Sequence, residues 1–438
     1  MKAVGWKQER LDTVSWSLKS GYKQRKYRVY VNSRFRFKLL NSSSMSTSDS
    51  TLTDALSWWH SNSEPHDRWL THEQMVKLFT KVNTNYSVIG RSVEGREIRE
   101  YVLGTGSRGA MLWSQMHGNE ATATYALMDL LLYIETHAQE SWLADVLRRI
   151  HIRVIPMVNP DGAERWSRRT ALNIDPNRDA VALSSPETKL LMDRIKASGA
   201  EVAFNLHDQR NIFHLEGTDH SAVISFLAPS ADASRSVNPT RRKSMNWISH
   251  LQKITKQFYE PGAGKYTDEY YPTAFGENVQ ALGIPTILIE SGAAPGDPNR
   301  NVARKLNFIL LIEALRVLSN STVLNDYSIA DYKAIPHNDN KQWDLKIENV
   351  TIRHSDRSIV ADLGIRYNYH PDKTTGKLAY MAILGDIGDL SHQCALQTID
   401  AKEAVFENGE RLPQLDEAAS FTLYGEQNIS IKNGVLIP

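Results

Sequence analysis

The chain has 438 residues, of which 41% are hydrophobic and 23% charged, a composition typical of a globular protein with room for more than one domain. Its net charge of +1 argues against a nucleic-acid partner, and its one cysteine, Cys394, excludes an internal disulfide framework and a cysteine-based zinc site. Because there is neither an apolar run of about 18 residues nor an apolar N-terminal signal core, we expect no membrane span and a cytoplasmic location.

Residues 1–44 differ from the rest of the chain because basic residues dominate them. Lysines and arginines recur from Lys23 to Lys38, and only Glu9 and Asp12 oppose them. We predict a disordered extension, or upstream sequence included by a misassigned start before Met45. The alternative is a basic arm that binds nucleic acid or a membrane surface.

Predicted helices and strands alternate from residue 45 to residue 335. Thr71 to Gln74 has the form of a capping box, which predicts the start of a helix, and Gly95 supplies a turn between two edge strands within 86–103. Further strands are expected at 111–116, 150–158, 202–206 and 284–289, and further helices at 122–136, 186–197, 241–259 and 302–318. This alternation predicts an α/β fold with a mostly parallel sheet between helices. In such sheets the site lies beyond the carboxyl ends of the strands.

The chain changes character in residues 336–438. Segments such as WDLKIENVTIRH and KLAYMAILG alternate apolar and polar residues and are separated by turn residues. Strands whose side chains alternate between two faces have this period of two. We therefore predict a small accessory all-β domain of sandwich type after the 45–335 domain.

A candidate metal site begins where the apolar run from Met111 ends in His117-Gly118-Asn119-Glu120. A catalytic zinc ion usually takes three protein ligands, and His-x-x-Glu supplies two of them. His207, which follows the predicted strand 202–206, is the candidate for the third.

Other residues compete with this assignment. His207 can also be read as a structural histidine at a strand end, and His214 and His220 lie nearby in a polar, loop-like setting. A second His-x-x-Glu, from His137 to Glu140, follows a polar helix end, and we assign it no function.

Two further stretches carry candidate catalytic groups. Arg168 and Arg169 precede Asn177 and Arg178 in one loop, where arginines beside asparagines can bind a carboxylate or an oxyanion; the alternative is a solvated basic loop. Glu290 ends the apolar strand 284–289, and a buried strand seldom ends in glutamate without a partner or a task.

Taken together, these motifs resemble the zinc carboxypeptidases of the carboxypeptidase A type. The match runs from about Ser92 to Gly292 and includes, in the family's order, SVEGREI, HGNE, NPDG, DPNRD, a strand-end histidine and a strand-end glutamate. The resemblance implies a mixed sheet between helices and one zinc ion per chain. It also implies that His117, Glu120 and His207 are the zinc ligands, with Glu290 as the general base that activates zinc-bound water. Arg169, with Arg168 as the less favoured choice, would polarise the scissile carbonyl, and Asn177 and Arg178 would hold the substrate's terminal carboxylate. Asp175 would be the carboxylate that orients the first zinc histidine.

The resulting hypothesis is a zinc metallocarboxypeptidase that hydrolyses the C-terminal amide bond of a peptide or peptide-like substrate with a free C-terminal carboxylate. The alternatives are a zinc-dependent deacylase of N-acyl amino acids and a non-catalytic binding protein on the same scaffold. The family's mobile tyrosine has no clean match, with Tyr270 and Tyr271 as candidates. Open points are the side-chain preference, the choice among peptide, cell-wall peptide and polyglutamate, the role of the tail domain, the true start residue and the oligomeric state.

Overall fold

The computed structural model describes residues 47–407, 411–426 and 428–437, so the predictions for residues 1–44 lie outside the described residues. By their contacts, the described residues form two compact units. The first, which we call the catalytic unit after the catalytic residues predicted in it, comprises residues 47–340 and Tyr369–Ala379, and the second comprises Lys341–Asn368 and the described residues from Tyr380 onward. The domain boundary predicted between residues 335 and 336 stays a prediction.

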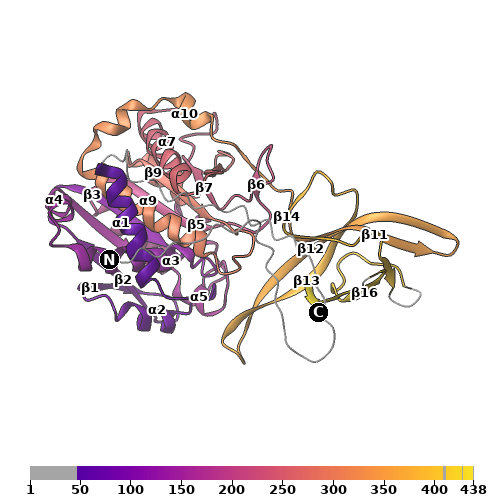
Figure 1. The fold of residues 1–438 in the computed structure, drawn as a ribbon. Coiled ribbons are helices and arrows are strands. Elements are labelled where there is room, and N and C mark those ends of the chain that lie inside the picture. The colour runs from indigo at the N-terminus through magenta and orange to yellow at the C-terminus, as the bar shows by residue number, and fades with distance from the viewer. Residues whose placement is uncertain (1–46, 408–410, 427, 438) are drawn as a thin grey trace, which may run out of the picture. The chain divides into compact units, whose positions relative to one another are not determined.

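An eight-stranded mixed sheet forms the centre of the catalytic unit (Figure 1). Its strands, in spatial order, are β1 (Tyr86–Arg91), β2 (Glu97–Leu103), β4 (Ile150–Ile155), β3 (Arg108–Ser114), β5 (Ala200–Asp208), β9 (Thr286–Ser291), β7 (Ile224–Leu227) and β8 (Gly264–Lys265). The central strands β4, β3, β5 and β9 are all parallel. A short second sheet pairs β6 (His214–Leu215) with β10 (Asn338–Asp339). The predicted fold class is confirmed.

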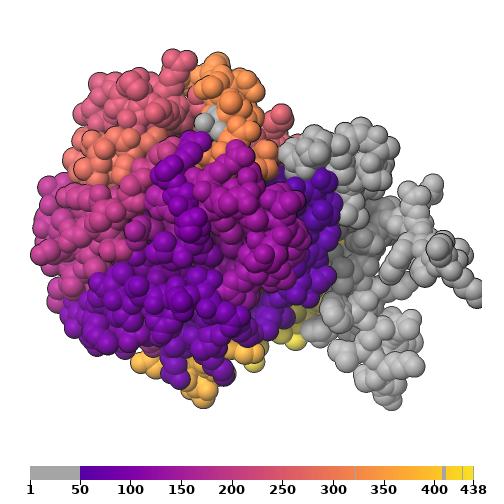
Figure 2. All heavy atoms as spheres, turned by 90° about the vertical axis from the view of Figure 1, so that its left-hand side faces the viewer, coloured from indigo at the N-terminus to yellow at the C-terminus, as the bar shows by residue number. Residues whose placement is uncertain are grey.

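Helices cover both faces of this sheet. They are α1 (Thr47–Asn62), α2 (His72–Phe79), α3 (Thr122–His137), α4 (Ser141–Arg149), α5 (Pro160–Glu164), α6 (Pro186–Lys196), α7 (Pro239–Phe258), α8 (Phe275–Ala281), α9 (Asn301–Ser319) and α10 (Ile329–Lys333), with 3-10 turns η1 (Pro176–Arg178) and η2 (Ser321–Asp326). Helices α1, α3 and α9 pack together, whereas α6 contacts β1 and α8 contacts β9. In Figure 2, residues from the first third of the chain form much of the face turned to the viewer. No helix within the described ranges is long and apolar enough to cross a membrane.

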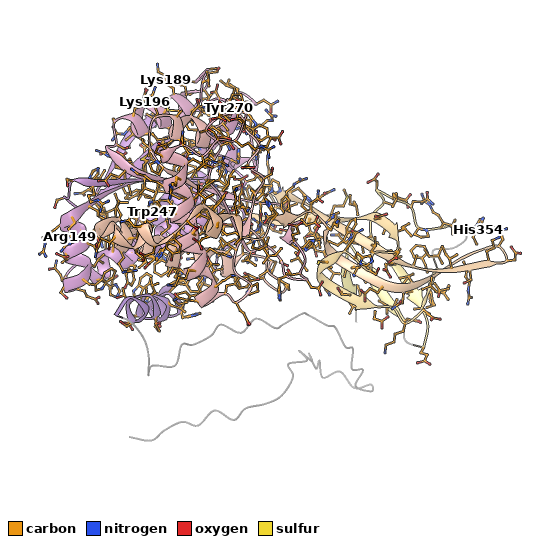
Figure 3. The ribbon with its side chains drawn as sticks, turned by 90° about the horizontal axis from the view of Figure 1, so that it is seen from above. Arg149, Lys189, Lys196, Trp247, Tyr270 and His354 are labelled. Carbon is orange, nitrogen blue, oxygen red and sulfur yellow. The ribbon has the colours of Figure 1, made fainter. Side chains whose placement is uncertain are left out.

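The central strands are buried on both faces, which explains why they read as nearly continuous apolar runs. Met111 and Trp113 of β3 belong to the core that also contains residues of α6 and α8. On the opposite face, Phe204 of β5 packs edge-on against Trp247 of α7, labelled in Figure 3, with 6.0 Å between the ring centroids.

Two local predictions are confirmed at the start of the unit. The Thr71 side chain accepts a hydrogen bond from the backbone of Gln74, whose side chain in turn accepts one from the backbone of Thr71, so α2 begins with a capping box. Gly95 lies in the turn between β1 and β2 with a φ of +83°, a conformation that glycine adopts without strain.

The second unit contains β11 (Gln342–His354), β14 (Cys394–Asp400), β15 (Val405–Glu407), β16 (Phe421–Tyr424), β17 (Ile429–Lys432), β18 (Val435–Ile437) and most of β12 (Arg357–Asp372) and β13 (Lys377–Gly388). Side chains such as Leu345, Leu363 and Leu423 form its own buried core. The predicted all-β region is confirmed. It differs from a sandwich of two sheets because hydrogen bonds join all eight strands into one sheet, in which β14 and β15 run parallel to β11.

A buried ion pair fastens α1 and the segment after it to α3 and α9 within the catalytic unit. Arg304 of α9 donates two hydrogen bonds to Asp129 of α3, at 2.6 and 2.7 Å, and both side chains are 1% exposed. Trp59 of α1 donates to the same carboxylate at 2.8 Å, and Arg304 also donates to the carbonyl oxygen of Glu64. Burial raises the pKa of Asp129 even though Arg304 lowers it, so desolvation offsets much of the attraction.

We expect Asp129→Asn to lower the free energy of unfolding by about 3–5 kcal/mol, because it leaves the Arg304 cation buried without a counter-charge. Lys81→Ala is the control, since the Lys81–Glu64 pair is exposed and should contribute less than about 1 kcal/mol. Urea unfolding, monitored by circular dichroism, measures the free energy of unfolding of both variants. Equal losses in the two variants would contradict this account.

Candidate metal centre

The candidate site lies where three neighbouring parallel strands end at one edge of the sheet. β3 leads through Gln115 and Met116 to His117, while His207 and Glu290 lie near the ends of β5 and β9. His207 and Glu290 are direct partners in the β5–β9 register, which fixes them side by side.

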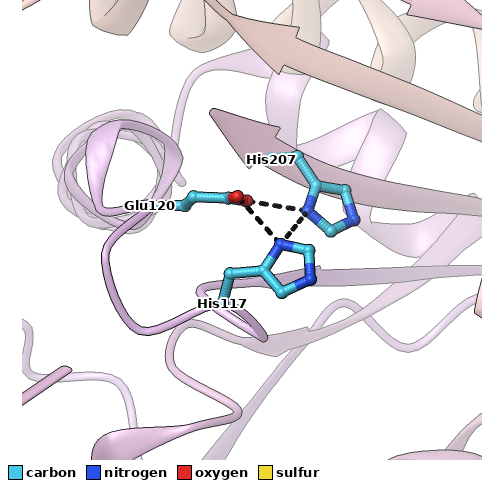
Figure 4. A group of neighbouring side chains, drawn as sticks. All are labelled: His117, Glu120 and His207. Carbon is cyan, nitrogen blue, oxygen red and sulfur yellow. Dashed lines mark hydrogen bonds and ion pairs between the residues drawn. The ribbon is translucent and has the colours of Figure 1, made fainter. Parts of the chain in front are cut away.

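His117, Glu120 and His207, here called the His-Glu-His group, meet at this edge (Figure 4). The two oxygens of Glu120 lie 2.8 Å from His117 Nδ1 and 2.8 Å from His207 Nδ1, and the two nitrogens are 3.2 Å apart. Their exposed fractions are 2%, 7% and 2%. Two imidazole nitrogens and a carboxylate that converge in a buried position could hold a metal ion.

Close backbone packing brings His117 and Glu120 to this position. A Cβ atom on Gly118 would lie 2.0 Å from the carbonyl carbon of Gly162, so the HGNE loop can approach the NPDG turn only with glycine at this position. Asp161 of the same turn accepts hydrogen bonds from the Ser92 hydroxyl and from Arg96, both at 2.7 Å. The SVEGREI and NPDG motifs, which are distant from each other in the sequence, therefore both support the HGNE loop.

Asp175 joins the His-Glu-His group to the Asn177–Arg178 pair. Its Oδ1 lies 3.2 Å from His117 Nε2 and also accepts a hydrogen bond from the backbone of Asn177 at 2.9 Å. A carboxylate at Nε2 favours the His117 tautomer that carries its proton on Nε2. The Nδ1 lone pair is then free to point toward Glu120 and His207. Asn177 accepts a hydrogen bond from the backbone of Phe275, and Arg178 lies over the Tyr271 ring at 4.4 Å.

The two candidate arginines occupy different places. Arg168 lies beside the group, with Nη1 3.1 Å from His117 Nδ1 and 3.5 Å from Glu120, and its Nε donates to Asp175 at 2.9 Å. Arg169 is exposed and donates instead to the carbonyl oxygen of Asn173. Of the two, the structure thus brings Arg168 to the group, although the sequence analysis preferred Arg169.

Tyr266, for which no role was predicted, follows β8 directly. Burial raises the pKa of its hydroxyl, and the charges of Glu290 and Glu120 raise it further. Its ring packs edge-on against Phe213 at 5.2 Å. Tyr270, labelled in Figure 3, and Tyr271 lie further along the same segment, and the Tyr271 hydroxyl donates to Glu269.

Negative charge accumulates around the group. Burial raises the pKa of Glu290, and the charges of Glu120 and Asp208 raise it further, whereas Arg168 and Arg300 lower it. Burial alone would also raise the pKa of Glu120, but the neighbouring His117 and His207 lower it well below its usual range. A divalent cation at the group would supply the positive charge that this cluster of carboxylates favours.

The zinc carboxypeptidase family model matches residues 73–179. This part of the chain is similar to that family. The matched part contains His117, Glu120, Arg168, Asp175, Asn177 and Arg178, whereas His207 and Glu290 lie beyond it. The family is one of zinc enzymes, and the His-Glu-His group has the donor types of a catalytic zinc site, so the predicted resemblance is confirmed.

Individual relatives agree over limited lengths. Carboxypeptidase 2 of Trichophyton rubrum is 32% identical over 104 residues, which are 23% of this chain and 19% of the relative. Carboxypeptidase SOL1 of Arabidopsis thaliana is 25% identical over 213 residues, 43% of this chain and 42% of the relative. The chain therefore spans about a fifth of the fungal relatives.

Solved structures with a similar fold include a metallo-carboxypeptidase from Burkholderia cenocepacia, with 18% identity and a TM-score of 0.45 over 56% of this chain and 68% of that one. Another is carboxypeptidase A from Helicoverpa armigera, with 14% identity and a TM-score of 0.45 over 62% and 80% of the two chains.

We expect His207→Ala to weaken zinc binding by more than about 100-fold, because loss of a ligand should cost more than the roughly 10–100-fold typical of a group that only supports one. Zinc retained after dialysis against a weak chelator, measured by atomic emission, reports this for wild type and variant. His220→Ala, an exposed histidine in the same part of the chain, should retain wild-type zinc. Retention of zinc by His207→Ala would show that the third ligand is another residue.

Proposed function

We propose that this protein is a zinc metallocarboxypeptidase that hydrolyses the C-terminal amide bond of a peptide or peptide-like substrate. The observation that carries the proposal is a buried His-Glu-His group with Arg168 beside it and with Glu290 paired in register with His207, joined through Asp175 to the Asn177–Arg178 pair. Bound zinc would supply the Lewis acidity that amide hydrolysis needs at neutral pH.

The chain's own residues account for binding and orientation of the substrate. The guanidinium of Arg178 offers paired donors that suit a terminal carboxylate. Asn177 uses its side-chain oxygen to accept from Phe275, which directs its amide nitrogen as a further donor. Asp175 contacts both this pair and His117, so the substrate's carboxylate would be held at a fixed offset from the group.

Glu290 is suited to the proton transfers. As general base it would accept a proton from the attacking water and deliver it to the nitrogen of the departing amino acid, which restores the carboxylate. Arg168 would stabilise the charge that develops on the carbonyl oxygen, and it replaces Arg169 in this role because of its position. We also propose that Tyr266, whose raised pKa keeps it protonated, donates a hydrogen bond to the bound substrate.

The proposal is tested with a peptide that has a free C-terminus, the same peptide amidated, and an N-acyl amino acid. We expect release of one residue from the free peptide and none from the amidated peptide, which presents no carboxylate to Arg178. The N-acyl amino acid keeps that carboxylate but lacks the residues that precede the cleaved bond, so we expect it to turn over more slowly than the free peptide. Preferential deacylation would favour the deacylase alternative, and absence of turnover with all three would favour a binding protein.

Glu290→Gln should reduce kcat by at least about 100-fold while zinc content stays at the wild-type level, because general base catalysis contributes roughly 10²–10⁴-fold. Mass spectrometry of the released residue and atomic emission measure the two quantities on one sample. Wild-type turnover by Glu290→Gln would rule out Glu290 as the base.

Arg168→Ala should lower kcat about 100–1000-fold, as expected when a donor to a developing oxyanion is removed. Arg169→Ala, one residue away and exposed, should stay within about twofold of wild type. The reverse order of effects would restore the assignment made from the sequence.

A further inference from the structure

Residues Tyr369–Ala379 belong by their contacts to the catalytic unit, although they lie far along the chain. They form an ordered turn in which Asp372 accepts hydrogen bonds from the backbone of Thr374 at 2.9 Å and from the Thr375 hydroxyl at 2.8 Å. Gly376 completes the turn with a φ of +68°. No role was predicted for this segment.

Tyr369 is fixed against two residues of the catalytic unit. The Arg68 guanidinium lies over its ring, 4.6 Å from the centroid, and Asn211 donates to its hydroxyl at 3.3 Å. Arg68 also lies 5.6 Å from the Trp166 ring, and Trp166 precedes Arg168 by two residues. The side chains of this cluster are partly exposed.

A continuous set of contacts connects Tyr369 to the His-Glu-His group. Glu120 accepts a hydrogen bond from the backbone of Asp208 at 3.2 Å, and Arg300 lies 3.4 Å from the Asp208 carboxylate. Arg300 then donates to Asn211 at 2.9 Å, and Asn211 donates to Tyr369. The Asn177–Arg178 pair is reached from the group through His117 and Asp175 instead, so the two sets of contacts leave the group through different members.

If Arg178 holds the terminal carboxylate, the part of the substrate that precedes the cleaved bond must leave the group on the side that Arg178 does not occupy. We propose that Tyr369, held by Arg68 and Asn211, forms a wall of the substrate site that contacts the residues preceding the cleaved bond. An aromatic ring stacked on a guanidinium offers a rigid, partly apolar surface, the kind of side-chain pair that dominates binding energy at interfaces. This inference rests on the proposed function for the direction of the substrate.

The test measures binding rather than turnover, on zinc-loaded Glu290→Gln protein by isothermal titration calorimetry. A dipeptide and a hexapeptide with the same two C-terminal residues serve as ligands. Adding Tyr369→Ala should weaken hexapeptide binding about 5–30-fold, as for a side chain that matters at an interface, and should leave dipeptide binding within about twofold. Tyr369→Phe, which removes only the hydroxyl that accepts from Asn211, should give a smaller loss with the same length dependence. Tyr424→Ala, an exposed tyrosine of the second unit, is the matched control.

Unchanged hexapeptide binding, or equal weakening for both lengths, would overturn the inference. Length-dependent weakening without any cleavage by the parent protein would support the wall while contradicting the proposed hydrolysis. If neither peptide bound, both the inference and the proposed function would fail.

Discussion

The site depends on one constraint, which is that parallel strands side by side must end at the same edge of their sheet. β3, β5 and β9 are consecutive neighbours in the sheet, so His117, His207 and Glu290 converge without any long-range loop to bring them together. The register pairs His207 with Glu290, and a slip of one residue would turn one of the two side chains to the other face. The buried apolar strands that supply the core thus also fix the relative positions of His207 and Glu290.

Buried charge at this edge has to be balanced. After burial, the charge of Glu120 raises the pKa of both Asp208 and Glu290, and Asp208 also raises that of Glu290, while Arg168 and Arg300 only partly offset the shift at Glu290. Arg300 also donates to the carbonyl oxygens of Ser291 and Gln209, so one buried cation ties the ends of β5 and β9 together. A cation held by the His-Glu-His group would complete this balance, and the same positive charge would favour the ionised form of Glu290 that a general base requires.

The central strands and the three members of the group could be predicted because apolar runs that end abruptly in histidine or glutamate leave a local signal. The choice between Arg168 and Arg169 could not be predicted, since two neighbouring arginines differ only in where their side chains point. That direction depends on a loop in which Trp166 and Asn173 have φ values of +53° and +63°. The roles proposed for Tyr266 and Tyr369 had no signal in the sequence, because they rest on tertiary contacts and burial. Helix α8 was missed because it is short and its N-cap residue, Ala274, has no side chain that could cap the helix.

The most direct test of the central claim is X-ray diffraction from crystals of the full chain grown with zinc, recorded on both sides of the zinc absorption edge. We predict one anomalous peak bonded to His117 Nδ1, His207 Nδ1 and the Glu120 carboxylate, at the roughly 2.0–2.2 Å usual for such ligands. A peak at other residues, or none at the His-Glu-His group in zinc-saturated crystals, would contradict the account.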